Sequence, residues 1–205
     1  MARELERFGM HLGTRIRFFD AYRLPDKGPF RSIGSNGNFN SQLEILRQAA
    51  AANESVLILE DDCEFLPAMA EFEVPEGTDI LYGGHHARTP GNLTESGIVG
   101  SHCIGYSARA AKLAAAYLER LLDVDFPPDE LAAKRKGFDP TIRPPIDGSL
   151  VWFRRAHPEL KTVFKMLAGQ RASRSDVTPQ YFFDRIAGLH VVGSALRWLK
   201  KRLLK

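Results

Sequence analysis

The stretch Ser55-Val-Leu-Ile-Leu-Glu-Asp-Asp-Cys-Glu64 places an unbroken apolar run directly before a group of acids. The run, Val56 to Leu59, includes β-branched residues, and this pattern predicts a strand buried on both faces of a parallel sheet. Glu60, Asp61 and Asp62 then fall at the carboxyl end of that strand. Open α/β sheets bind their ligands at this end, so the stretch predicts a binding site as well as a strand.

The three adjacent carboxylates repel one another, and this repulsion points to a ligand. Because side chains alternate along a strand, we expect Glu60 and Asp62 to point to one side and Asp61 to the other. A divalent cation, alone or together with a sugar, would relieve the repulsion. The alternative is an acidic exit from the strand that only faces water.

The composition is that of one globular domain. The chain has 205 residues, of which 44% are hydrophobic and 26% charged, which allows one sizeable core and little room for two. The net charge of +3 gives no argument for a nucleic-acid partner. Neither a signal peptide nor a transmembrane run is recognisable, and Cys63 and Cys103 lack zinc-site spacing, so we expect a reducing, cytoplasmic compartment.

The chain around the acidic stretch alternates expected strands and helices. A capping-box pattern at Ser41 and Glu44 predicts a helix that ends near Asn53. Together with a strand over residues 16–19 and the strand over residues 56–59, this helix would form one right-handed βαβ unit.

The rest of the chain predicts further elements of the same two kinds. They are a helix over 3–10, a strand over 79–82 closed by Gly83-Gly84, a strand over 98–106, a helix from Ser107 to about 122, a short helix near 130–135, a helix from Asp147 to 155 and a strand over 160–166. His85 and His86 fall in an expected loop.

Several motifs resemble, in the same order, those of glycosyltransferase family 25, whose members add galactose or glucose during lipopolysaccharide assembly. The motifs are Gly37-Asn38-Phe39-Asn40-Ser41, Leu43-Glu44-Ile45-Leu46, Val56 to Asp62, Gly100 to Ser107, Pro145-Ile146-Asp147, Gln170 and Ser175-Asp176. The resemblance covers nearly the whole chain.

The resemblance implies a GT-A-like α/β domain over residues 1–190, with a mostly parallel sheet flanked by helices. It also implies a UDP-hexose donor, a glycan or lipid-linked acceptor, and Mn²⁺ (or Mg²⁺), because the leaving nucleoside diphosphate develops negative charge. By the family's Asp-x-Asp logic, Glu60 and Asp62 would hold the metal, and Glu60, Asp61 and His102 would contact the donor. The alternative for His102 is a structural histidine between glycine-rich turns.

Asp147 stands at the family's Pro-x-Asp position, which implies that it is the catalytic base. An inverting transfer needs a carboxylate that takes the proton of the acceptor hydroxyl. Asp also commonly precedes a helix as its N-cap, and this role is the alternative.

Two departures from the family pattern matter. Gln42 stands where the family usually has His, and a Gln side chain hydrogen-bonds but does not titrate near neutral pH. The family's first strand, which helps to cradle the nucleotide base, has no counterpart before the helix expected over 3–10. Both departures motivate the alternative of a non-catalytic relative that binds nucleotide or sugar.

A third class, a metal-dependent phosphohydrolase using Asp61 and Asp62, lacks supporting motifs.

The last segment, residues 191–205, predicts a basic amphipathic helix. Leu196, Leu199 and Leu203 form one stripe, and Lys and Arg residues crowd the remainder. This pattern is typical of a helix that lies on an anionic membrane surface, here the inner face of a membrane that carries the acceptor. The alternative is a helix that packs its leucines on the domain.

Overall fold

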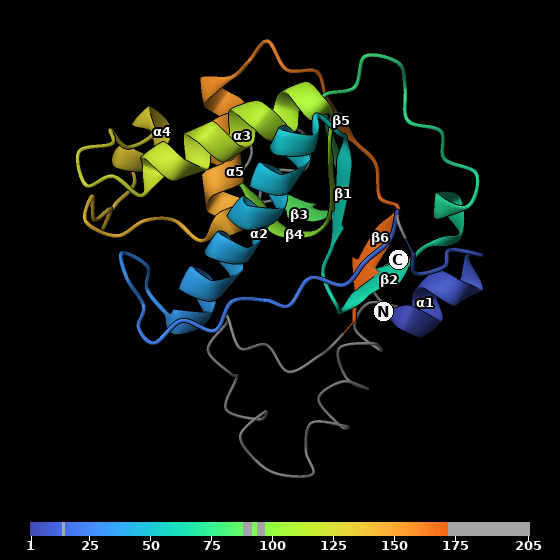
Figure 1. The fold of residues 1–205 in the computed structure, drawn as a ribbon. Coiled ribbons are helices and arrows are strands. Elements are labelled where there is room, and N and C mark those ends of the chain that lie inside the picture. Colours follow the sequence, from blue (N-terminus) through green and yellow to red (C-terminus); the bar gives the residue numbers. More distant parts are fainter. Residues whose placement is uncertain (14, 88–91, 94–96, 172–205) are drawn as a thin grey trace, which may run out of the picture.

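A computed structural model describes residues 1–13, 15–87, 92–93 and 97–171 (Figure 1). The main sheet has four strands in the order β1-β4-β3-β5. Its strands are β1 (Val56–Leu59), β3 (Ile80–Ala87), β4 (Ile98–Tyr106) and β5 (Thr162–Phe164). A second sheet pairs β2 (Cys63–Phe65) with β6 (Ala168–Gln170). With the helices around them, the two sheets form a single mixed α/β domain.

The sheets are mostly antiparallel, so the predicted mostly parallel sheet is wrong. The pairs β1–β4, β3–β4 and β2–β6 are antiparallel, and β3–β5 is parallel. Among the described residues β1 lies at an edge of its sheet, and Leu57 is 43% exposed rather than buried. A short apolar run fits a strand of either direction, because its pattern records burial and not the orientation of the neighbouring strand.

Three helices cover one face of the main sheet, namely α2 (Ile33–Ala52), α3 (Ala108–Leu121) and α5 (Ile146–Ala156) (Figure 1). Their apolar side chains and those of the strands form the larger core, which includes Phe39, Leu46, Ile104, Leu118 and Leu150. The 3₁₀ turn η1 (Pro67–Met69) and the short helix α4 (Glu130–Ala133) lie in the connections.

The other face is covered by β2, β6 and the short helix α1 (Ala2–Arg7). The smaller core on this side consists of Leu5, Cys63, Phe65, Cys103 and Ala168. Because Cys103 and Ile104 are consecutive in β4 and belong to different cores, the two cores lie on opposite faces of the sheet.

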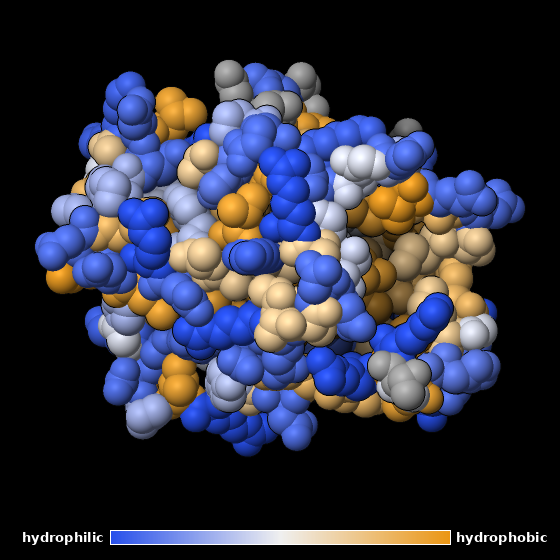
Figure 2. All heavy atoms as spheres, turned by 45° about the horizontal axis from the view of Figure 1, so that its top comes forward, coloured by the Kyte–Doolittle hydropathy of each residue, from blue (hydrophilic) through white to orange (hydrophobic). Residues whose placement is uncertain are grey.

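The surface is not uniformly polar. Figure 2 shows a largely hydrophilic exterior with apolar side chains gathered around a hollow on one side of the molecule. In the part of the chain that the structure describes, no helix is both long enough and apolar enough to cross a bilayer.

Helix α2 begins at Ile33, so the predicted capping box at Ser41 is wrong. The side chain of Ser32 caps the helix, and Ser41 lies in its middle. The Ser41 hydroxyl donates to the carbonyl of Gly37 at 2.7 Å and accepts from the amide of Tyr22 at 2.9 Å. Ser41 therefore ties the preceding segment to the helix instead of starting it.

Other local predictions are confirmed. The strands over 56–59 and 98–106 have the expected bounds, Ser107 caps α3 with its side chain, and α2 stops at Asn53 in the left-handed conformation, φ 54°.

Residues 16–19 form no strand, so the predicted βαβ unit does not form. The segment 191–205 lies outside the described residues.

Strand β3 continues past Gly83 and Gly84, where a strand end was predicted, and its register with β4 shifts between Tyr82 and Gly84 and again between Gly84 and His86. A β-carbon on Gly83 would lie 2.6 Å from the Cys103 sulfur, and one on Gly84 would lie 2.3 Å from Nε2 of His102. These glycines therefore permit close contact with β4 rather than a turn. His85, predicted in a loop, is a buried residue of β3.

Candidate functional site

The three acids form the tight turn between β1 and β2. The amide of Glu60 donates to the carbonyl of His102 at 3.0 Å, and the amide of Cys63 donates back to the carbonyl of Glu60 at 3.1 Å. Glu60 and Asp62 are partly buried and Asp61 is exposed. The Glu60 carboxyl lies near Gln42 of α2, and the Asp62 carboxylate accepts a hydrogen bond from Gln170 of β6.

Glu60 experiences the strongest electrostatic effect in this turn. Burial, together with the charges of Asp62, Asp147 and Asp61, raises the pKa of Glu60 to about 7, against a hydrogen bond with Asn38 that lowers it. Asp147 comes from α5, so the fold brings all four predicted acids into one electrostatic field. A carboxyl of this kind exchanges protons near neutral pH and has much to gain from a neighbouring cation.

The side-chain nitrogen of Gln42 lies near three side-chain oxygens, one of which belongs to Glu60. The Gln42 side-chain nitrogen lies 3.4 Å from Oδ1 of Asn38, 3.5 Å from Oε1 of Glu60 and 3.5 Å from Oγ of Ser101. Asn38 and Gln42 lie one turn apart on α2, Ser101 lies on β4, and Gln42 is only 3% exposed. We call Asn38, Gln42, Glu60 and Ser101 the oxygen cluster.

Asp147 is fixed in place by the main chain. Oδ2 accepts a hydrogen bond from the amide of Gly100 at 3.0 Å, and Oδ1 accepts one from the amide of Gly148 at 2.9 Å. Pro145 occupies the N-cap position of α5, so Asp147 is not the N-cap that the sequence offered as its alternative role. It lies in the first turn of α5, where the helix N-terminus attracts negative charge.

The end of β6 anchors the acidic turn. The Gln170 side-chain nitrogen donates to Oδ2 of Asp62 at 2.9 Å. The amide of Arg171 donates to the carbonyl of Asp62 at 2.8 Å, and its guanidinium donates to the carbonyl of Asp61 at 2.9 Å. A cationic side chain therefore lies beside the acids on the exposed side of the turn.

The His102 side chain does not join the oxygen cluster. Its ring is 0% exposed, and Nε2 lies 3.2 Å from the carbonyl of Ala168 in β6. The ring therefore presents no exposed atom to a bound donor in this structure. His102 serves the turn through its main chain, since its carbonyl accepts the hydrogen bond from Glu60.

The groups around Glu60 match Mn²⁺ or Mg²⁺ in the chemical type of their atoms. Within the described residues no three His, Cys, Asp or Glu side chains are arranged to hold a metal ion. The groups that do gather are carboxylate, amide and hydroxyl oxygens, which are the ligands that hard cations prefer. Oε1 of Gln42 is buried without a hydrogen-bond partner among these residues. In this structure the Gln42 nitrogen faces these oxygens, and their chemical type is the one that a hard cation would take as ligands.

Sequence reasoning nominated the acids but not their uncharged neighbours. Asn38 and Ser101 lie inside the quoted motifs without an assigned role, and Gln42 entered only as a departure from a family pattern. The i, i+4 spacing of Asn38 and Gln42 could have identified them as neighbours, because it places both on one helix face. This spacing was not considered, because the helix was expected to start at Ser41, after Asn38.

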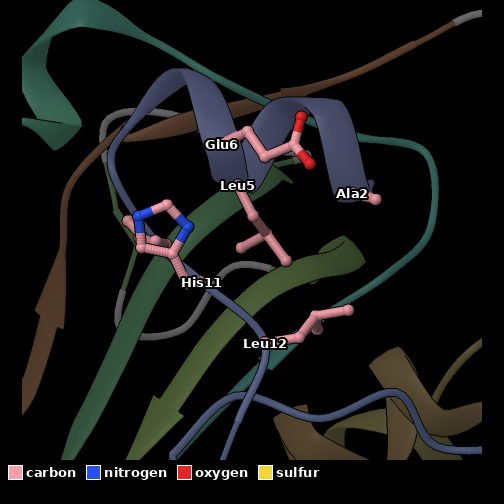
Figure 3. A pocket seen from close by; sticks show the side chains of 6 residues that line it. Ala2, Leu5, Glu6, His11 and Leu12 are labelled. Carbon is pink, nitrogen blue, oxygen red and sulfur yellow. The ribbon is translucent and has the colours of Figure 1, made fainter.

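A small hollow lies elsewhere, beside α1. It has a volume of about 130 Å³ and is lined by Ala2, Leu5, Glu6, Met10, His11 and Leu12 (Figure 3). Leu5 and Leu12 face the same space in this view. This volume is well below the few hundred Å³ that small-molecule sites usually enclose, so the hollow is too small for a nucleotide sugar.

Comparisons of the chain with protein-family models, with curated proteins and with solved structures find no match.

Proposed function

We propose that this chain is a metal-dependent glycosyltransferase that moves a hexose, galactose or glucose, from a UDP-sugar to a cell-surface glycan such as lipopolysaccharide. The observation that carries the proposal is the environment of Glu60. Its pKa is raised to about 7 by burial and by the charge of Asp62, with Asp147 contributing from α5. The order of the sequence motifs adds support, because it contains the same acids.

In the proposed reaction Glu60 and Asp62 would hold Mn²⁺, which would supply positive charge for the departing diphosphate. Gln170 positions the Asp62 carboxylate through its 2.9 Å hydrogen bond. Asp61, the exposed acid of the turn, contacts the donor from the solvent side.

Asp147 is the proposed base for the acceptor hydroxyl. The amides of Gly100 and Gly148 each donate to one of its oxygens, which fixes the direction of the carboxylate. Each oxygen retains a second lone pair that can receive a proton. Orientation by the main chain is what a base needs, because the hydroxyl must lie within hydrogen-bond distance of it.

A second candidate function is a non-catalytic relative that binds a nucleotide or sugar. Two observations favour it. Gln42 replaces a residue that would titrate, and within the described residues no three acids or histidines are arranged for a metal.

The proposal is tested by UDP release from a panel of UDP-hexoses with Mn²⁺. We expect the wild-type protein to release UDP, and Glu60→Gln and Asp147→Asn to lower the rate by a factor of about 10² to 10⁴. Glu54→Gln is the matched control, because Glu54 is an exposed acid just before β1. It should leave the rate unchanged.

Thermal shift with UDP and Mn²⁺ separates the candidates. A folded wild-type protein that is stabilised by UDP but releases none from any UDP-hexose supports the non-catalytic candidate. A folded protein that neither binds nor releases UDP contradicts the proposed transfer and the nucleotide-binding form of the second candidate.

A further inference from the structure

The Gln42 amide lies in an unusual environment for a buried side chain. Its nitrogen faces three oxygen atoms at 3.4 to 3.5 Å, which is longer than the 2.9 to 3.0 Å of a typical N–H···O hydrogen bond. All three contacts are made by one atom of the amide. The nitrogen is therefore crowded by acceptors without a short bond to any of them.

The oxygen of the same amide, Oε1, lacks a partner among the described residues. Oε1 is buried and makes no hydrogen bond with any residue that the structure describes. A half-turn of the amide about its last bond exchanges the two atoms, since they are nearly equal in shape. That rotation places Oε1 beside Glu60, Asn38 and Ser101 and directs the unused oxygen into the oxygen cluster.

The main chain at Gln42 is held in place by the packing of α2. Its neighbours on α2, Phe39, Leu43 and Leu46, are at most 1% exposed in the larger core. Ser41 ties the same turn of the helix to Tyr22. Rotation of the amide is consequently the simplest change open to this side chain.

We propose that Gln42 is a ligand of the divalent cation, contributing Oε1 next to the Glu60 carboxylate. The inference rests on the proposed function, because that function places the cation at Glu60. Mn²⁺ and Mg²⁺ take about six oxygen ligands, and the acids that gather here are too few to supply them. A neutral amide oxygen fills a ligand position without adding charge to acids that already repel one another.

The experiment measures Mn²⁺ binding to the full chain, from the EPR signal of free Mn²⁺, with and without UDP. Gln42→Met keeps the length of the side chain and removes its oxygen. We expect it to weaken Mn²⁺ binding about 10-fold or more, in the range seen when residues that support a metal site are changed. Gln48→Met is the matched control, because Gln48 lies on the same helix and bonds Glu44 instead.

A second measurement uses the wild-type protein and so does not depend on whether a variant folds. Mg²⁺ is added while the side-chain amide signals of Gln42 and Gln48 are followed by NMR. The Gln42 signal should shift with the same midpoint as Mg²⁺ binding, and the Gln48 signal should remain unchanged.

The outcomes separate this inference from the proposed function. If Glu60→Gln abolishes Mn²⁺ binding but Gln42→Met binds as the wild type does, Gln42 is not a ligand and the proposed metal site stands. If Gln42→Met weakens only UDP-hexose binding, Gln42 contacts the donor and the inference is wrong. If the folded wild-type protein binds no Mn²⁺ with or without UDP, the metal dependence of the proposed function fails, and this inference fails with it.

Discussion

The two faces of the main sheet differ in how far their buried polar side chains are hydrogen-bonded. On the face covered by β2 and β6, Cys63 and Cys103 hydrogen-bond to each other, which, together with burial, raises the pKa of Cys63. The His102 ring on this side lies against the carbonyl of Ala168. On the helical face, Gln42 keeps an unused oxygen and Glu60 keeps an acid whose pKa is raised to about 7.

This difference indicates which face holds a site. Polar groups that satisfy one another inside a core contribute to structure, and their atoms are not offered to a ligand. Polar groups that remain strained by burial or by like charge are stabilised when a ligand arrives. By this criterion the oxygen cluster is the place to test for function, and the thiol pair with His102 is structural support for the turn.

The largest expected effect concerns the packing of the two faces. Leu46→Ala, in the larger core, should lower the free energy of unfolding by about 4 kcal/mol. Leu5→Ala, in the smaller core on the short helix α1, should cost only about 2 kcal/mol, because α1 can move to close the space. Urea denaturation of both variants measures the difference. An equal loss would show that the two faces are packed alike.

The next effect comes from the titration of Glu60. Its pKa is raised from 4.5 to about 7 on folding, so between these values the folded protein binds the proton more tightly than the unfolded chain. Stability should therefore fall as the pH rises through this window, by up to about 3 kcal/mol. Glu60→Gln carries no charge at any pH and should lose this dependence.

Urea denaturation in EDTA at several pH values tests the prediction. Glu60→Gln should equal the wild type below pH 4.5 and exceed it in stability above pH 7, where the wild-type carboxyl is ionised. Glu54→Gln, at an exposed position, should follow the wild-type curve. Parallel curves for the wild type and Glu60→Gln would mean that burial does not strain this acid.

A smaller effect tests the close approach of β3 and β4. Gly84→Ala would place a methyl group 2.3 Å from Nε2 of His102, a ring that is fully buried and cannot swing into solvent. We expect a loss of about 2 kcal/mol from overpacking. In Gly169→Ala nothing lies within 4 Å of the new carbon, so its stability should change by at most about 0.5 kcal/mol. Thermal unfolding of the pair provides the comparison, and equal stabilities would contradict tight packing at His102.

Elements fixed by neighbouring residues could be predicted from the sequence. The apolar run at 56–59, the Ser107 cap and the Asn53 stop depend on interactions within a few positions, and each is found where it was expected. Helix α2 was predicted too short because Gly, Ser and Asn are weak helix formers. Asn36 near its start donates to the carbonyl of Asp26, and Ser41 in its middle accepts from the amide of Tyr22, contacts that no local pattern reveals.

The acids of the candidate site could be predicted from the sequence, but its uncharged residues could not. Glu60, Asp62 and Asp147 were nominated from their residue type and position, and the fold does bring their charges together. The oxygen cluster depends on how α2 and β4 meet, because Gln42 and Ser101 are 59 positions apart in the chain. Gly83 and Gly84 were misjudged for the same reason, since Gly signals a turn unless the partner strand is known.

The bond between Gln170 and Asp62 joins residues 108 positions apart, and this separation affects how the protein is made. A ribosome adds about 5 to 20 residues per second, so the acidic turn emerges roughly 5 to 20 seconds before the strand that anchors it. Pairings across such a separation also form late during folding, because a long loop must close first. The nascent chain therefore carries an unfinished turn until synthesis has passed β6.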